Sequence, residues 1–223
     1  MKLGQLIGEA RSEVDDKVEP YLWADDDWKA YFNWAESEAC RRAHLLIDST
    51  TSEICEVAIA AETASYPLDA RVVSIRRVKL ESQTRPLTQA TRDDLDATVY
   101  DWENRKGYPE VFISESDGEL LLVPKPVSAD TGHLTVARLP LNDMTDLDND
   151  SPEIAARYHR DLIFGACSRA YLKNDEDTFN IKKSQHYEAL FTQKFGPPVS
   201  AKAEQMRRRT PRNAHVRWRQ FGF

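Results

Sequence analysis

Hydrophobic residues recur at helical spacing near both ends of the chain. Apolar positions three or four residues apart mark two segments before residue 50 and two after residue 150, and each pattern predicts a helix. A last helical stretch is expected just before the C-terminal end. In chain order the expected helices are Leu3–Val14, Asp25–Leu46, Ser151–Lys173, Ile181–Phe195 and Ser200–Arg209. Three consecutive aspartates cap the second helix, and Gly196-Pro197-Pro198 breaks or kinks the fourth.

The segment Ser151–Lys173 has the strongest pattern and is interpreted as one helix at the centre of the core. Ser151 can cap it, and Pro152 lacks an amide hydrogen that the first turn would leave unpaired. Apolar residues then recur every four positions, and the turn around Phe164 is apolar on every side. Gly165 costs roughly 1 kcal/mol of helix propensity relative to alanine. We therefore expect another helix to pack against it at close range, and no chemistry from this helix.

Between residues 53 and 139 the hydrophobic period changes to two, which predicts strands. The expected strands are Ile54–Ile59, Val72–Leu80, Val111–Ile113, Leu120–Val123 and Leu134–Leu139. Asp117-Gly118 is a strong hairpin signal between the third and fourth strands. The connections are expected to be a turn over Tyr66–Asp69, a capped helical turn over Thr91–Leu95 and a loop over Trp102–Pro109. Five strands in this length predict a small antiparallel sheet or barrel.

These elements predict an α+β fold: an α-helical bundle with an inserted small antiparallel β-domain and an extended C-terminal arm. The expected organisation assigns residues 1–50 to the N-terminal helices of the bundle and residues 51–145 to the β-domain. Residues 146–200 form the C-terminal helices of the bundle, and residues 201–223 form a basic arm.

Composition places the chain among globular proteins. No apolar run approaches the roughly 18 residues of a membrane span, and the N-terminal residues lack the apolar core and cleavage site of a signal peptide. The three cysteines Cys40, Cys55 and Cys167 are widely spaced in apolar surroundings, so we interpret them as reduced core residues of an intracellular product.

Charge is divided unevenly along the chain. The net charge is −7, yet residues 201–223 hold seven basic side chains against one acidic, which leaves −13 on the first 200 residues. The residues of this arm predicted to bind a partner are Arg207, Arg208, Arg209, Arg212, Arg217, Trp218, Arg219, Phe221 and Phe223. Arginine with aromatic residues suits nucleic acid or an anchor on a protein, and a disordered solubilising end is the remaining alternative.

No residue constellation predicts a catalytic, cofactor-binding or metal site. The chain lacks a glycine-rich phosphate loop, a GxSxG elbow and CxxC or HxxxH spacing. Asp146–Asp150 imitates the start of a calcium loop, but the twelfth position holds Arg157 instead of glutamate. His159 lies among acid-base groups that a helix would point in different directions, so it is interpreted as a polar-face or interface residue. The sequence therefore predicts that the protein is not an enzyme.

Several short segments together resemble the head-to-tail adaptor (neck, or connector) proteins of tailed bacteriophages, in particular the podovirus tail-tube adaptors. The segments are Trp28–Ile47 with Asp48-Ser49-Thr50-Thr51, Tyr66-Pro67-Leu68, Ile75-Arg76-Arg77-Val78, Gly107-Tyr108-Pro109, Leu120–Pro126, Arg138-Leu139-Pro140-Leu141, Pro152-Glu153-Ile154 and Tyr158-His159. The resemblance covers about residues 20–195 and rests on a pattern of elements.

The resemblance implies a structural virion protein made in the host bacterial cytoplasm. In that family twelve copies form a ring beneath the portal protein and connect it to the tail or nozzle protein. The ring continues the channel through which genomic DNA passes, and the C-terminal arms bind the portal. No catalytic residue, cofactor or membrane contact is implied. The alternative is a DNA-binding module that uses the basic tail, and an enzyme such as a phage lysozyme or nuclease has no supporting residues.

Overall fold

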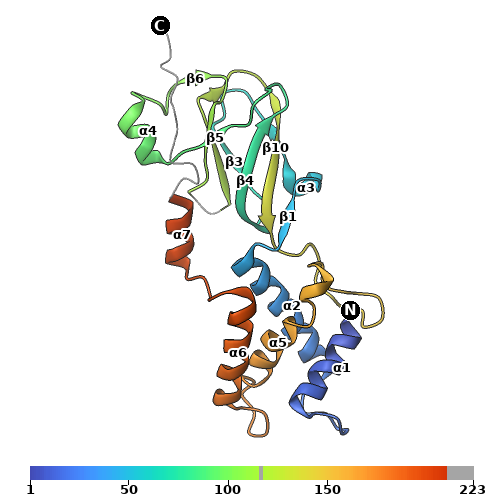
Figure 1. The fold of residues 1–223 in the computed structure, drawn as a ribbon. Coiled ribbons are helices and arrows are strands. Elements are labelled where there is room, and N and C mark those ends of the chain that lie inside the picture. Colours follow the sequence, from blue (N-terminus) through green and yellow to red (C-terminus); the bar gives the residue numbers. More distant parts are fainter. Residues whose placement is uncertain (116–117, 210–223) are drawn as a thin grey trace. The chain divides into compact units, whose positions relative to one another are not determined.

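The computed structural model describes residues 1–115 and 118–209, with side chains as far as residue 206 (Figure 1). It confirms the α+β fold class, since helices and mixed sheets alternate as blocks along the chain. The chain divides into two compact units. We call residues 1–46 with 138–199 the helical unit, and residues 47–137 with the segment from residue 200 onward the β-rich unit.

The helical unit is built from segments at the two ends of the sequence. Its elements are α1 (Leu3–Val14), α2 (Asp25–Ala43), the short 3₁₀ helix η1 (Ala156–Tyr158), α5 (Leu162–Ala170) and α6 (Ile181–Phe195). The prediction for α6 is confirmed to the residue, and α1 spans the apolar positions that marked it. Helix α2 begins at the first of the three aspartates but ends at Ala43, before the expected end at Leu46. Amphipathic spacing thus located three of the four α-helices of this unit.

Helix α5 lies at the centre of this unit, between α2 and α6. The expected close approach at Gly165 is confirmed. A Cβ atom there would lie 2.8 Å from the Phe191 ring of α6 and 3.0 Å from the Cβ of Ala35 on α2. The glycine therefore exchanges helix propensity for close packing of both neighbouring helices.

The prediction of one continuous helix over Ser151–Lys173 is wrong. Only η1 and α5 are helical within that segment, and its first five residues form no helix. The physical reason is a tertiary contact: the backbone N–H groups of Glu153 and Ile154 donate to the side chain of Glu36 on α2. A cap from Ser151 is therefore not what satisfies these donors.

A buried arginine near the C-terminal end of α2 joins this helix to the C-terminal half of α6. Arg42 donates to Glu38 one turn earlier (2.8 Å) and to Glu188 on α6 (2.9 Å). It also donates to the carbonyl of Gly196, where α6 ends. The guanidinium thus does more than complement the dipole of its own helix, because it fixes the break at Gly196 against α2.

The β-rich unit contains ten strands and three helices among the described residues. They are β1 (Leu46–Asp48), α3 (Ser52–Cys55), β2 (Glu56–Ile59), β3 (Ser65–Pro67), β4 (Val72–Leu80), β5 (Thr88–Gln89), α4 (Arg92–Thr98), β6 (Lys106–Gly107), β7 (Val111–Ile113), β8 (Glu119–Val123), β9 (Lys125–Pro126), β10 (Asp130–Arg138) and α7 (Ala201–Arg209). The first residue of β1 and the last residue of β10 belong to the helical unit. One sheet has the order β1-β10-β2, with β4 also paired to β10, and a second has the order β3-β8-β7-β5. Strands β6 and β9 form a separate pair.

Several strand predictions need correction. The segment expected to begin the first strand is helical over Ser52–Cys55, and only Glu56–Ile59 is a strand. The first half of the expected turn over Tyr66–Asp69 belongs to strand β3, and the expected loop over Trp102–Pro109 contains β6. The sheets are not purely antiparallel, because β5 pairs in parallel with β7 and β6 with β9.

Other predictions for this unit are confirmed. Strand β4 has the predicted bounds, and β7 and β8 pair antiparallel, so Phe112 lies opposite Leu122. Helix α4 is capped by Thr91, whose hydroxyl accepts from the N–H of Asp94 (3.1 Å) while the Asp94 carboxylate accepts from the N–H of Thr91. Leu95 and Trp102 then pack with Val111 in the core of the unit.

Candidate assembly site

The predicted partner-binding arm lies mostly beyond the part of the chain that the structure describes. Arg212, Arg217, Trp218, Arg219, Phe221 and Phe223 fall outside the described residues. Arg207, Arg208 and Arg209 belong to α7, but their side chains are also outside the description. The helical stretch expected over Ser200–Arg209 is present as α7, and the Ser200 hydroxyl accepts from the N–H of Ala203 (3.2 Å) at its start.

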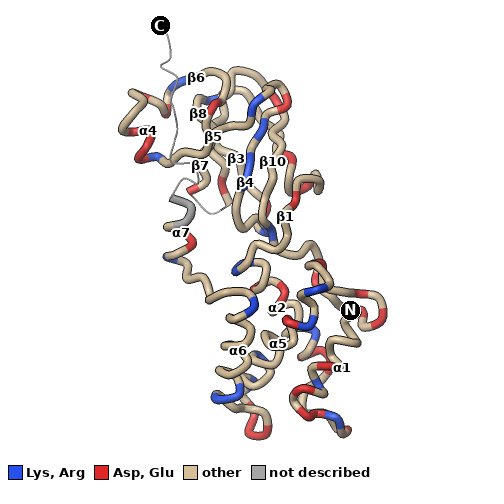
Figure 2. Tube along the Cα trace, viewed as in Figure 1, with Lys and Arg blue, Asp and Glu red and all other residues tan. Residues whose placement is uncertain are grey.

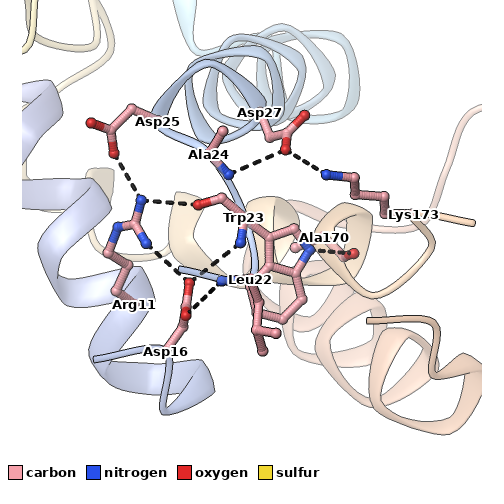
Figure 3. A network of polar contacts seen from close by, with 9 residues as sticks. All are labelled: Arg11, Asp16, Leu22, Trp23, Ala24, Asp25, Asp27, Ala170 and Lys173. Atoms are coloured by element: carbon pink, nitrogen blue, oxygen red, sulfur yellow. Dashed lines mark hydrogen bonds and ion pairs between the residues drawn. The ribbon is translucent and has the colours of Figure 1, made fainter. Parts of the chain in front are cut away.

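A buried polar network organises the turn between α1 and α2 (Figure 3). Arg11 of α1 is buried and donates to the carboxylates of Asp16 (3.0 Å) and Asp25 (2.8 Å). It also donates to the carbonyl of Trp23 (2.9 Å). Asp16 in turn accepts from the backbone N–H of Leu22 (2.9 Å). One guanidinium therefore holds the end of α1, the turn and the start of α2 in a fixed arrangement.

The same turn is fixed to the end of α5. The Trp23 indole donates to the carbonyl of Ala170 (2.9 Å), and Lys173 donates to Asp27 (2.7 Å), as Figure 3 shows. The pKa of Lys173 is raised, chiefly by this hydrogen bond to Asp27. Two loops of the helical unit are thus held together by directed bonds.

These two loops carry large apolar side chains that are exposed to solvent. In the α1–α2 and α5–α6 loops the exposed residues are Val18, Tyr21, Leu22, Leu172 and Phe179, and Ile181 opens α6. Exposed apolar groups on a rigid support are typical of protein–protein contact surfaces. This end of the helical unit is therefore a candidate surface for contact with another protein.

The three aspartates lie in the first turn of α2, but the prediction that they cap the helix holds only for Asp27, because the residue at the cap is Ala24. Asp27 accepts from the N–H of Ala24 (3.3 Å), Asp25 pairs with Arg11, and Asp26 accepts from Lys29 (2.9 Å). Within residues 1–115 and 118–209 no group of three or more histidine, cysteine, aspartate or glutamate side chains is arranged to hold a metal ion.

The calcium-like segment Asp146–Asp150 uses its carboxylates to hold its own turn. Asp146 accepts from the N–H groups of Asp148 (2.8 Å) and Asn149 (3.1 Å). Asp150 accepts from the N–H groups of Thr145 (2.7 Å) and Asp146 (2.8 Å). Hydrogen bonding, with the Asn149 side chain first, lowers the pKa of Asp146. The segment is a polar loop of the helical unit.

His159 is buried, which corrects the expectation of a polar-face or interface position. Its Nε2 lies 2.9 Å from the carbonyl of Ile154 and must donate to it, which leaves Nδ1 to accept from the backbone nitrogen of Met1 at 2.8 Å. The imidazole thus links the start of α1 to the turn before η1. The cysteines are buried as expected, and burial raises the pKa of Cys40 to about 12 and that of Cys167 further above its usual range.

Glu36 was not singled out by the sequence and is the most perturbed carboxylate in the helical unit. Its side chain is 2% exposed, and one oxygen accepts from the N–H groups of Glu153 (2.5 Å) and Ile154 (3.2 Å). Burial raises its pKa to about 7 despite these two bonds, and the charges of Glu153 and Asp143 add to the effect. The signal in the sequence was its position four residues after Phe32, within an apolar face.

Glu153 extends this network to the end of β10. Its carboxylate pairs with the buried guanidinium of Arg138 and accepts from the N–H of Leu141 (2.9 Å). Arg138 is the first residue of the helical unit after the chain leaves the β-rich unit. Asp48, next to the other crossing, accepts from the Thr51 hydroxyl (2.7 Å) and caps the turn before α3. Segments that carry the family resemblance therefore make hydrogen bonds within each unit, next to the points where the chain leaves it.

The comparison with protein families decides the identity of the chain. A family model described as SU10 adaptor protein matches residues 1–217. The chain belongs to the SU10 adaptor protein family. The match extends beyond the range of about 20–195 that the quoted segments covered, so it includes α1 and most of the C-terminal arm. No curated protein matches the chain.

Membership of the SU10 adaptor family has direct consequences for the function. The protein is a structural bacteriophage adaptor and a virion component that associates with other virion components, and the family is not one of enzymes. Among the described residues, none of the helices has the length and apolar character needed to cross a membrane.

Proposed function

We propose that this SU10 adaptor is a head-to-tail adaptor whose copies form a ring beneath the portal. The ring joins the portal to the tail or nozzle protein and continues the channel through which genomic DNA leaves. The observation that carries the proposal is the family match over residues 1–217. The α1–α2 and α5–α6 loops of the helical unit are held together by hydrogen bonds and carry exposed apolar side chains. They supply a surface on which a second virion protein can dock.

The charge distribution supports a conduit. The first 200 residues carry a net charge of −13, and tight binding of duplex DNA depends mostly on lysine and arginine at phosphates. An acidic wall repels the phosphate backbone, which lets DNA slide instead of holding it.

The C-terminal arm, residues 201–223, is proposed to bind the portal. The side chains assigned to this contact are Arg207, Arg208, Arg209, Arg212, Arg217, Trp218, Arg219, Phe221 and Phe223. Arginine makes bidentate bonds to carboxylates, and the aromatic residues supply compact anchors. A single arm binds weakly, but a ring presents many arms, and avidity strengthens the attachment without new contacts.

The proposal is tested by mixing the purified protein with assembled portal rings and weighing the complexes by mass photometry. We expect full-length protein to convert free portal into a complex that gains many copies. A variant lacking residues 201–223 should lose only the helical signal of α7 from its circular dichroism spectrum and should fail to attach. If full-length protein leaves the portal mass unchanged, the proposed function is wrong; if the truncated variant attaches as tightly as full-length protein, only the role of the arm is wrong.

A further inference from the structure

Strand β4 carries a group of cations without partners in the described chain. Arg76 and Arg77 are exposed and Lys79 is half-buried, and none of their side chains forms an ion pair or hydrogen bond with a described residue. Two other cations of the β-rich unit do form ion pairs: Arg71 with Asp69 at 2.8 Å and Lys106 with Glu62 at 2.6 Å. Figure 2 shows the basic residues along β4. In a protein whose body is acidic, this basic strand needs an explanation.

A segment of opposite charge lies elsewhere in the same unit. We call residues 92–103, which include α4, the acidic knob. Its carboxylates are Asp93, Asp94, Asp96, Asp101 and Glu103, against the single cation Arg92. Tyr100 of the knob is 91% exposed. Figure 1 shows α4 projecting from one side of the unit, apart from β4, and no ion pair joins the two within residues 1–115 and 118–209.

The knob is held in shape by its own contacts. The capping box of Thr91 and Asp94 fixes the start of α4. The Trp102 indole donates to Asp96 (2.7 Å) while its ring is buried in the core of the unit. Because these bonds are already made, the exposed position of Tyr100 belongs to an ordered segment. An exposed tyrosine between carboxylates, next to a backbone held in this way, is the kind of side chain that anchors protein interfaces.

We propose that, in the ring, the acidic knob of one copy packs against β4 of the next copy. The inference rests on the proposed function, because a ring of identical copies requires a heterologous interface in which two different surfaces of the chain fit each other. Asp93 and Glu103 then face Arg76 and Arg77 of the neighbour, and Tyr100 packs against an arginine side chain. The two surfaces are complementary in charge and separate on the same unit, as such an interface demands.

The same contact explains why a carboxylate-rich protein assembles side by side. Identical acidic bodies repel each other, and opposite charges that meet across the interface offset this repulsion. Among the described strands, β4 pairs only with β10 and so borders its sheet. Cations on such a strand discourage pairing with further strands, which explains the charges of β4 without a partner protein. Contact of these arginines with DNA phosphates is the other alternative. The experiment separates these three outcomes.

Charge reversal in the full-length protein tests the proposal. One variant carries Arg76→Glu and Arg77→Glu, and the other carries Asp93→Arg and Glu103→Arg. A matched control, Arg85→Glu with Arg157→Glu, changes the net charge as much as the first variant does, at exposed positions outside both surfaces. Ring formation on assembled portals is followed by mass photometry, and circular dichroism checks the fold of each variant.

We expect each variant alone to lose ring formation and the control to retain it. An equal mixture of the two variants should form rings, because each interface then joins an acidic surface to a basic one. Combining all four substitutions in one chain should also restore assembly. If wild-type protein forms rings and both variants do as well, β4 merely protects the sheet border and the inference fails while the proposed function stands. If the β4 variant assembles normally but loses affinity for duplex DNA, the cations serve DNA and the inference is equally wrong.

Discussion

Replacing Glu36 with glutamine should remove a pH-dependent loss of stability from the helical unit. The buried carboxylate has a pKa of about 7 in the folded protein, against 4.5 for an ordinary glutamate. Glutamine keeps the side-chain oxygen that accepts from the N–H groups of Glu153 and Ile154. The substitution therefore removes the titration while it preserves the two hydrogen bonds.

The sign follows from proton binding. Because the folded-state pKa lies above the unfolded-state value, the folded protein holds the proton more tightly. The stabilising contribution is fully present below about pH 4.5 and is lost as the pH rises through about 7. At about 1.4 kcal/mol per pH unit of difference, the loss amounts to roughly 3 kcal/mol. For a chain of this size that corresponds to a change of about 6–12 °C in melting temperature.

Urea unfolding of wild-type and Glu36→Gln protein between pH 5 and pH 8, followed by far-ultraviolet circular dichroism, measures this effect. The stability of the variant relative to wild type should increase steadily with pH, by up to about 3 kcal/mol. Glu176→Gln, the same chemical change at an exposed loop position, is the control and should leave the profile unchanged. A difference that stays constant across this pH range, or decreases, would refute the reasoning.

Two further substitutions test the packing and the polar network of the helical unit. Gly165→Ala should destabilise the protein by about 1–3 kcal/mol despite the better helix propensity of alanine, because its Cβ would lie 2.8 Å from the Phe191 ring; thermal melting measures this, and an unchanged or higher melting temperature would contradict the packing argument. Asp16→Ala should cost about 3–5 kcal/mol in urea unfolding, because it deprives the buried Arg11 of a partner; a loss below 1 kcal/mol would show that Asp25 alone suffices.

Much of the fold could be predicted because local signals and tertiary packing agree. Helices α1, α2 and α6 have amphipathic spacing and clear ends, and β4 has strand-like periodicity over nine residues. The continuous helix over Ser151–Lys173 was predicted wrongly because the prediction rested on local hydrophobic spacing, which carries no information about Glu36. That carboxylate lies more than a hundred positions earlier and takes the N–H groups at the start of the segment.

The short strands could not be predicted from periodicity. Strands β5, β6 and β9 have two residues each, which is too few to show an alternation. Their parallel pairing depends on partners far away in the sequence. The candidate site likewise could be predicted only in part. Composition identified the basic arm, whereas the buried Arg11 network and Glu36 depend on which residues the fold brings together.

Single-particle imaging of the full-length protein with assembled portal rings tests the adaptor role most directly. The account predicts a closed ring of copies that is coaxial with the portal and extends its channel. An unoccupied portal, or copies bound to it without forming a ring around the channel axis, would contradict it.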